Sequence, residues 1–225
     1  MRKGRFDISH YTNWNKSRIN TIIDYYGEEF FKNKEVLEVG CGWAAMGAHF
    51  SSIGANVTVS DAREEHISVI KERYPQLKGL VVDSEDTNWV YENQMYDVII
   101  HFGLLYHLRN PEDNLRLTTR HCETLILETE VLDSDDPEQI ILIKEETNWD
   151  HGAWGMAHSG TGCRPSYAWV ERILNDCNME VTRIPKPELA NAGSHNYSWN
   201  RANKEKVDNP KLVSGRRAMW FCKRK

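Results

Sequence analysis

The sequence lacks any long apolar run and any cysteine arrangement typical of a cross-linked or zinc-binding protein. No segment approaches the roughly 18 consecutive apolar residues that a membrane helix needs. The five cysteines are scattered and include no C-x-x-C pair, which indicates neither a disulfide framework nor a zinc ribbon. We therefore expect a cytoplasmic protein with reduced thiols and no membrane contact.

Excess positive charge is also absent. The net charge of −5 argues against a protein that coats nucleic acid through its overall charge. Basic residues nevertheless gather in 211–225 and acidic residues in 128–146, and solvated surface is the ordinary explanation for both. A length of 225 residues with 40% apolar content suits a single domain over 1–225.

Short apolar strands and amphipathic helices alternate along the chain. Apolar residues at helical spacing predict a first helix over 17–32. Seven strands with helices between them predict a Rossmann-like α/β fold, a three-layer sandwich with a mostly parallel sheet and an antiparallel last strand. The predicted strands are 36–39, 57–60, 80–82, 96–102, 124–127, 180–184 and 217–223.

Two long stretches, 129–164 and 185–215, do not follow the alternating pattern and should be irregular. Long loops in compact domains often form lids or acceptor sites. We expect 129–164 to be a lid or acceptor insertion, with Trp149, His151, His158 and Arg164 as substrate-binding residues. A metal site is the less favoured alternative, because the spacing matches no recurrent zinc pattern.

The first strand runs into two closely spaced glycines, Gly40 and Gly42, before the next helix. Glycines allow the backbone to approach a ligand closely. Asp61, 21 residues after Gly40, can accept hydrogen bonds from both ribose hydroxyls. Glu38 suits the cationic amino group of S-adenosylmethionine (SAM) and would repel a dinucleotide pyrophosphate. A glycine-rich connection without a ligand remains the alternative.

Parallel strands place their carboxyl ends at one edge of the sheet, so further cofactor contacts are expected there. Asp83 can accept from the adenine amine and the Ser84 N–H can donate to a ring nitrogen, although Asp83 would also suit a helix N-cap. Trp14 and Lys16 can fold over the cofactor carboxylate. The predicted cofactor residues are Trp14, Lys16, Glu38, Gly40, Cys41, Gly42, Asp61, Ala62, Asp83, Ser84, Phe102, Gly103 and Tyr106.

His107 is the ionisable group expected nearest the methyl group, where a neutral imidazole can accept a proton from the acceptor. A purely structural histidine remains open, and displacement of a cationic sulfonium can proceed without a base. No Pro-Cys pair follows the fourth strand and no Asp/Asn-Pro-Pro-Tyr segment occurs. The chain therefore lacks the usual cysteine nucleophile of enzymes that methylate a pyrimidine ring carbon. It also lacks a motif found in enzymes that methylate an amide nitrogen or an exocyclic base nitrogen.

These motifs resemble those of class I SAM-dependent methyltransferases over roughly 35–128, with Ala44 replacing the third glycine. Within that superfamily, 103–107, Asn110-Pro111 and 127–133 resemble the tRNA wobble-uridine carboxymethyltransferase group, whose N-terminal region has no counterpart here. The resemblance implies that Tyr106 lies in the cofactor site near the transferred group, as a second catalytic candidate beside His107.

The sequence thus predicts a methyltransferase that uses SAM, yields S-adenosylhomocysteine (SAH) and methylates oxygen or nitrogen of a small molecule or sugar by in-line displacement. The first alternative is a tRNA-modifying methyl- or carboxymethyltransferase. A more distant alternative is a nicotinamide-dependent oxidoreductase, in which Gly40, Gly42 and Ala45 would form the dinucleotide-binding fingerprint. A catalytically inactive binding domain is also compatible with the sequence.

Overall fold

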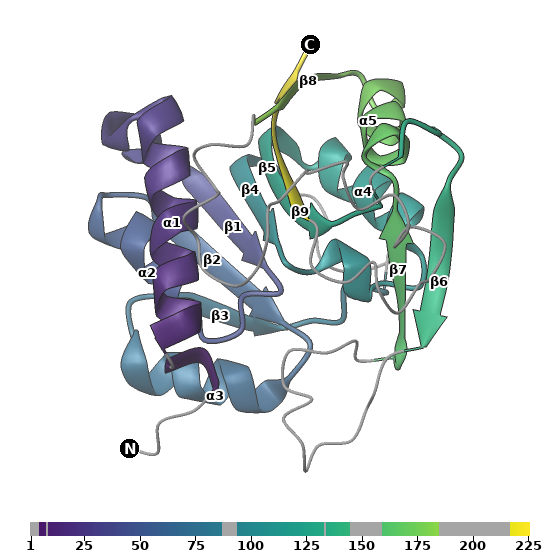
Figure 1. The fold of residues 1–225 in the computed structure, drawn as a ribbon. Coiled ribbons are helices and arrows are strands. Elements are labelled where there is room, and N and C mark those ends of the chain that lie inside the picture. Colours follow the sequence, from purple (N-terminus) through teal and green to yellow (C-terminus); the bar gives the residue numbers. More distant parts are fainter. Residues whose placement is uncertain (1–4, 8, 87–93, 133, 145–158, 185–216) are drawn as a thin grey trace.

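One seven-stranded sheet with helices on both faces forms the body of the protein (Figure 1). The computed structural model describes residues 5–7, 9–86, 94–132, 134–144, 159–184 and 217–225. Helices α1 (Ser9–Tyr26), α2 (Ala45–Ser52) and α3 (Glu64–Arg73) pack on one face. Helices α4 (Pro111–Arg120) and α5 (Tyr167–Asp176) cover the other. The predicted three-layer α/β sandwich is confirmed.

The sheet has the strand order β3-β2-β1-β4-β5-β9-β8. All neighbours run parallel except β9, which is antiparallel to both β5 and β8. The predicted mostly parallel sheet with an antiparallel last strand is therefore confirmed. The strands are β1 (Glu35–Val39), β2 (Asn56–Asp61), β3 (Lys78–Val81), β4 (Tyr96–Phe102), β5 (Cys122–Glu130), β8 (Met179–Arg183) and β9 (Arg217–Arg224).

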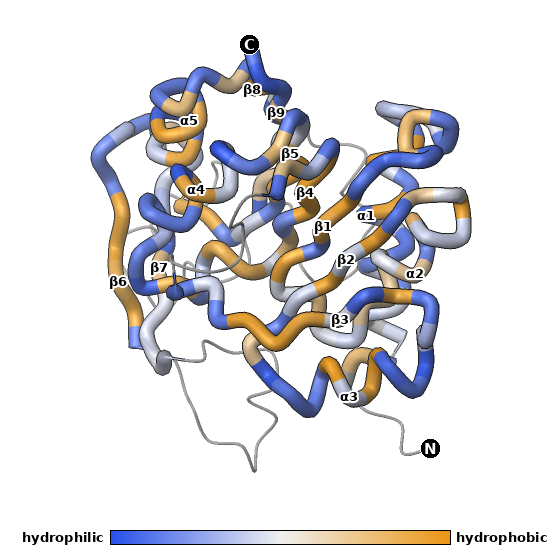
Figure 2. The backbone as a smooth tube through the Cα atoms, turned by 180° about the vertical axis from the view of Figure 1, so that it is seen from behind, coloured by the Kyte–Doolittle hydropathy of each residue, from blue (hydrophilic) through white to orange (hydrophobic). Residues whose placement is uncertain are grey.

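The central strands are buried on both faces, because helices cover both. On β1, Val36 joins the apolar cluster under α1, α2 and α3, whereas Leu37 and Val39 join the cluster under α4 and α5. Hydrophobic residues accordingly run along β1, β2 and β4 in the middle of the sheet (Figure 2). Doubly covered parallel strands typically read as continuous apolar runs. No helix in the described part of the chain has the length and apolar character of a membrane span.

The first helix lies earlier than the predicted 17–32. In the structure α1 covers Ser9–Tyr26, and Gly27, with φ of 77°, follows it. A 3-10 helix, η2 (Glu28–Phe31), then continues the chain. The spacing of apolar residues did not show that α1 and η2 are two elements, because Phe30 and Phe31 pack on the same core as α1.

The stretch 129–164, expected to be irregular, contains regular structure. Strand β5 extends to Glu130, and β6 (Ile140–Lys144) pairs with β7 (Thr161–Pro165) as an antiparallel two-stranded sheet. Figure 1 shows this pair beside α5 and away from α1. All five residues of β6 are half-buried or exposed, although four of them are apolar. Its sequence therefore lacks the alternation of polar and apolar residues that would have predicted a strand. The segment 145–158 lies outside the described residues.

Gly47 allows α2 to approach β1 and β2 closely. A Cβ at this position would lie 2.7 Å from Glu38 Oε2 and 2.7 Å from Val59 Cγ1. Close helix–strand packing is the usual role of the third glycine of a dinucleotide fingerprint. The chain therefore carries such a glycine two residues after the fingerprint position, where the sequence has Ala45.

We expect Gly47→Ala to lower the free energy of unfolding by about 1–3 kcal/mol, because the added methyl group overpacks this contact. The gain in helix propensity offsets part of the loss. Urea unfolding measures the change. Gly79→Ala is the comparison, since its Cβ would meet Ile67 Cγ2 at 3.2 Å and should cost less. An equal or smaller loss for Gly47→Ala would contradict this interpretation.

Candidate functional site

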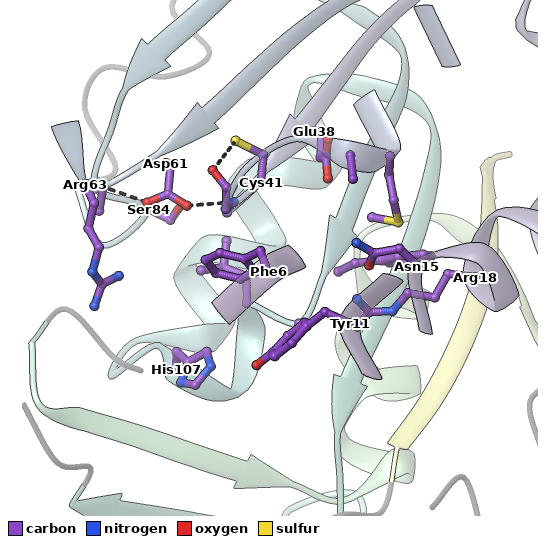
Figure 3. A pocket seen from close by; sticks show the side chains of 18 of the residues that line it. Phe6, Tyr11, Asn15, Arg18, Glu38, Cys41, Asp61, Arg63, Ser84 and His107 are labelled. Atoms are coloured by element: carbon purple, nitrogen blue, oxygen red, sulfur yellow. Dashed lines mark hydrogen bonds between the residues drawn. The ribbon is translucent and has the colours of Figure 1, made fainter. Parts of the chain in front are cut away.

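A pocket opens at the carboxyl ends of β1, β2 and β4, where the sequence places the cofactor. Figure 3 shows Asp61 and Arg63 at one end, Arg18 and Asn15 at the other, and Phe6 between them. Most residues predicted from the sequence are brought together here. Those lining the pocket are Trp14, Glu38, Gly40, Cys41, Gly42, Asp61, Ala62, Asp83, Ser84, Phe102, Gly103, Tyr106 and His107.

The floor of the pocket is the turn between β1 and α2. Gly40 and Gly42 have φ of 61° and 56°, values that residues with a Cβ rarely adopt. A Cβ on Gly40 would lie 3.1 Å from the Leu104 side chain, and one on Gly42 would lie 3.1 Å from the Phe6 ring. Both conformation and space thus favour glycine.

Asp61 ends β2 and points its carboxylate at this turn. Its Oδ2 accepts from the Gly42 N–H at 2.9 Å, and its Oδ1 accepts from the Arg63 N–H at 3.0 Å. The Nδ1 atom of His66 lies 3.0 Å from the same Oδ1. These contacts fix the carboxylate while leaving acceptor capacity on Oδ2, which has one of the three contacts.

Glu38 is a buried carboxyl group in the pocket wall. Its side chain is 3% exposed, and its Oε2 accepts from the Gly47 N–H at 2.8 Å. Burial raises the pKa of Glu38 to about 8, although the Gly47 N–H and the charge of Arg18 act in the opposite direction. A positively charged ligand group beside it would favour the ionised form.

Arg18 is a pocket residue that sequence reasoning missed. It is 5% exposed, pairs with Glu128, and lies 3.5 Å from the ring centroid of Trp14. Its Nε has no hydrogen-bond partner within the described ranges. The available signal was its spacing, four residues after Trp14 and thus on the same helical face. Lys16 is exposed and does not line the pocket.

Tyr106 and His107 lie together on the short helix η3 (Leu105–His107), with ring centroids 3.9 Å apart. The Tyr106 hydroxyl accepts from Arg217 Nη2 at 2.8 Å. Burial raises the pKa of Tyr106 to about 12 despite the opposing charge of Arg217. Tyr106 therefore stays protonated at neutral pH and cannot act as a base, which leaves His107 as the candidate.

Arg164 lies behind Tyr106 and not among the lining residues. Its Nη2 is 2.7 Å from Glu130 Oε2, and its Nη1 donates to the Tyr106 carbonyl at 3.3 Å. The other predicted substrate residues, Trp149, His151 and His158, fall outside the described residues. Within the described part, no three His, Cys, Asp or Glu side chains are grouped to hold a metal ion.

Phe6 and Tyr11, from the N-terminal segment, also line the pocket. Their rings meet edge to face with centroids 5.3 Å apart, and Phe6 contacts His66 in the same way at 5.4 Å. Two hydrogen bonds from Arg73 to Asp7, at 2.7 and 2.9 Å, hold this segment against α3. Nothing in the sequence indicated these contacts, because they depend on the path of the chain.

Curated relatives match part of the chain. A ubiquinone biosynthesis O-methyltransferase from Roseobacter denitrificans is 30% identical over 95 residues, covering 41% of this chain and 38% of the relative. One from Shewanella pealeana is 31% identical over 112 residues, covering 48% and 46%. The chain thus spans less than half the length of these relatives.

Solved structures share the fold at low sequence identity. The N-terminal domain of EvdMO1 with SAH bound has a TM-score of 0.64 and 15% identity, covering 93% of this chain and 80% of that one. Magnesium protoporphyrin IX methyltransferase from Synechocystis PCC 6803 with bound SAM has a TM-score of 0.61 and 12% identity, covering 100% and 86%.

A family model described as a methyltransferase domain matches residues 11–183. This span contains the glycine turn, Asp61, the loop after β3 and η3, which together build most of the pocket. It confirms the superfamily part of the resemblance drawn from the sequence. The chain belongs to the methyltransferase-domain family.

Proposed function

We propose that this chain transfers a methyl group from SAM to an oxygen atom of a small molecule. The observation that carries the proposal is the pocket in which Glu38 and Asp61 flank a turn whose conformation and space favour glycine at positions 40 and 42. The curated relatives are named as O-methyltransferases, which favours oxygen among the predicted acceptor atoms. The solved relatives include structures with SAM or SAH.

The charges around Arg18 suit the amino-acid end of SAM. Three buried guanidinium groups, on Arg18, Arg164 and Arg217, face two buried carboxylates, Glu128 and Glu130, so the cluster carries one excess positive charge. Arg18 can bind the methionine carboxylate and Glu38 the ammonium group. Burial in low dielectric makes such pairing strong.

At the other end of the pocket, we assign Asp61 to the ribose hydroxyls and Asp83 and Ser84 to adenine, since all three line the pocket. SAM supplies a sulfonium methyl group that an acceptor oxygen displaces in line, leaving a neutral thioether. Tyr106 and His107 would lie near this step. His107 can take the proton that the acceptor hydroxyl loses as its oxygen bonds to the methyl group. Tyr106, whose oxygen accepts from Arg217, can donate a hydrogen bond to the acceptor molecule while keeping its own proton.

The alternative functions have less support. Glu38, buried beside the glycine turn, offers a pyrophosphate no positive charge, whereas its ionised form suits the ammonium group of SAM, which argues against a nicotinamide oxidoreductase. For tRNA, the basic C-terminal stretch would have to reach phosphates, yet Arg217 is buried against Glu128 and Arg224 donates to the carbonyls of Thr119 and Cys122. A small-molecule acceptor is therefore the function that we propose.

The proposal is tested by thermal shift with SAM, SAH and a nicotinamide dinucleotide. The protein is then incubated with SAM carrying a deuterated methyl group and with either a metabolite extract or total tRNA. We expect SAM and SAH to stabilise the protein and mass spectrometry to find the label on a hydroxyl-derived oxygen. Stabilisation by the dinucleotide alone would reject the proposal. Label on tRNA nucleosides would redirect it to the alternative acceptor.

Replacing Asp61 tests the ribose assignment. We expect Asp61→Asn to weaken SAH binding by about 1–3 kcal/mol, because hydrogen bonds to a carboxylate are stronger than those to an amide. Isothermal titration calorimetry measures the loss. Asp97→Asn is the matched control, since Asp97 pairs with Lys34 at the opposite edge of the sheet and should bind SAH normally. Unchanged affinity in Asp61→Asn would refute the ribose role.

Glu38 predicts a pH dependence. Its pKa of about 8 in the free protein means that binding an ammonium group at neutral pH must release a proton. SAH affinity should therefore rise as pH increases from about 6 to 8, by at most about tenfold per unit. Glu38→Gln should bind more weakly and lose this dependence. Calorimetry in buffers of different ionisation enthalpy counts the protons, and no release by the wild type would contradict the assignment.

A further inference from the structure

A hydrogen-bonded pair of buried side chains lies behind the pocket and outside its lining. His101 on β4 and Asn114 on α4 are 0% and 2% exposed. The Nε2 atom of His101 lies 2.8 Å from Asn114 Oδ1, and Asn114 Nδ2 donates to the Ser84 carbonyl at 3.1 Å. The pair thus connects the centre of the sheet to the loop after β3.

The direction of these hydrogen bonds is fixed. Because the Asn114 amide nitrogen donates to the Ser84 carbonyl, Asn114 Oδ1 must be an acceptor, and His101 Nε2 must carry the hydrogen. Burial lowers the pKa of His101 to about 4, so this histidine is neutral at physiological pH. The neutral ring with its hydrogen on Nε2 in turn prevents the Asn114 amide from flipping.

The loop held by Asn114 presents one acceptor and one donor to the pocket. Asp83 Oδ1 accepts from the Glu85 N–H at 3.0 Å, whereas Asp83 Oδ2 and the Ser84 N–H have no hydrogen bond among the described residues. Adenine presents an amino donor beside a ring-nitrogen acceptor. The two patterns are complementary only if Ser84 keeps its orientation. The Asp83–Ser84 peptide is held by the Asp86 N–H, which donates to the Asp83 carbonyl at 2.9 Å.

Asn114 holds the following peptide, between Ser84 and Glu85. Its hydrogen bond to the Ser84 carbonyl restrains the Ser84 backbone from the C-terminal side. A second tie, from the Arg109 N–H and Asn110 Nδ2 to the Glu85 carboxylate, holds the next residue of the loop. It acts through the Glu85 side chain and not on a backbone group of Ser84, so it constrains the Ser84 backbone less.

We propose that Asn114, oriented by His101, is a positioning residue that sets the adenine selectivity of the pocket by holding Ser84. This rests on the proposed function, because it requires adenine to bind at Asp83 and Ser84. Neither side chain touches the ligand. Their effect is on which base is accepted, so a purely structural role would leave base selectivity unchanged.

The test compares SAH with the analogue in which hypoxanthine replaces adenine. Hypoxanthine exchanges the amino donor for a carbonyl and protonates the adjacent ring nitrogen, so it inverts the pattern that Asp83 and Ser84 read. We expect the wild type to prefer SAH by about 100-fold, since a hydrogen-bonding site left unpaired rejects a ligand strongly. In Asn114→Leu the preference should fall to about tenfold or less, through weaker SAH binding.

A second variant protects the test against misfolding. Asn114→Leu alone leaves the His101 N–H buried without a partner, which is destabilising, whereas removing both polar groups of such a pair can be nearly neutral. The double variant His101→Phe/Asn114→Leu should therefore fold and show the same loss of selectivity. Asn175→Leu is the control, because Asn175 is exposed on α5 and its side-chain amide donates to the Glu171 carbonyl, away from the pocket.

In the wild type, SAH should also shift the side-chain amide NMR signals of Asn114 more than the hypoxanthine analogue does. Unchanged selectivity in the folded double variant, or an equal loss of affinity for both ligands, would overturn the inference. If the wild type binds neither ligand, the proposed function itself fails, which separates the two outcomes.

Discussion

The fold and the pocket both depend on the buried carboxylate of Glu128. It lies on β5 with no exposed surface and pairs with Arg18 of α1 and Arg217 of β9. Burial alone would raise the pKa of Glu128, but the two guanidinium groups hold it below its ordinary value. Removing one partner would leave an uncompensated buried charge, which is strongly destabilising. Glu128 thus joins an early helix to the last strand and places Arg18 in the pocket.

Several pocket groups are already engaged by the protein itself. Asp61 accepts from the Gly42 N–H in the glycine turn and from the Arg63 N–H after β2, and Glu38 accepts from Gly47. Tyr106 is held by Arg217. Groups fixed in this way need little reordering when a ligand binds, which reduces the entropic cost of binding. The contacts that stabilise the carboxyl edge of the sheet therefore also preorganise the proposed cofactor site.

Sequence reasoning succeeded where the signal was local. A strand followed by Gly40 and Gly42, and a second strand ending in Asp61, predicted the side chains that meet at one edge, because parallel strands impose that arrangement. It failed where position depends on packing. The weak alternation of Ile140–Lys144 did not reveal β6, and Gly47 was missed because its role is set by the distance between α2 and β2.

The sequence by itself determined the α/β class, the seven main strands and the glycine turn between two acidic residues, since periodicity and backbone sterics act over neighbouring residues. Only the tertiary structure decided that Arg18 rather than Lys16 enters the pocket, and that Arg164 and Arg217 turn inward. Burial of a guanidinium requires carboxylates that are distant in sequence, here Glu128 and Glu130. Those pairings exist only once the strands are aligned.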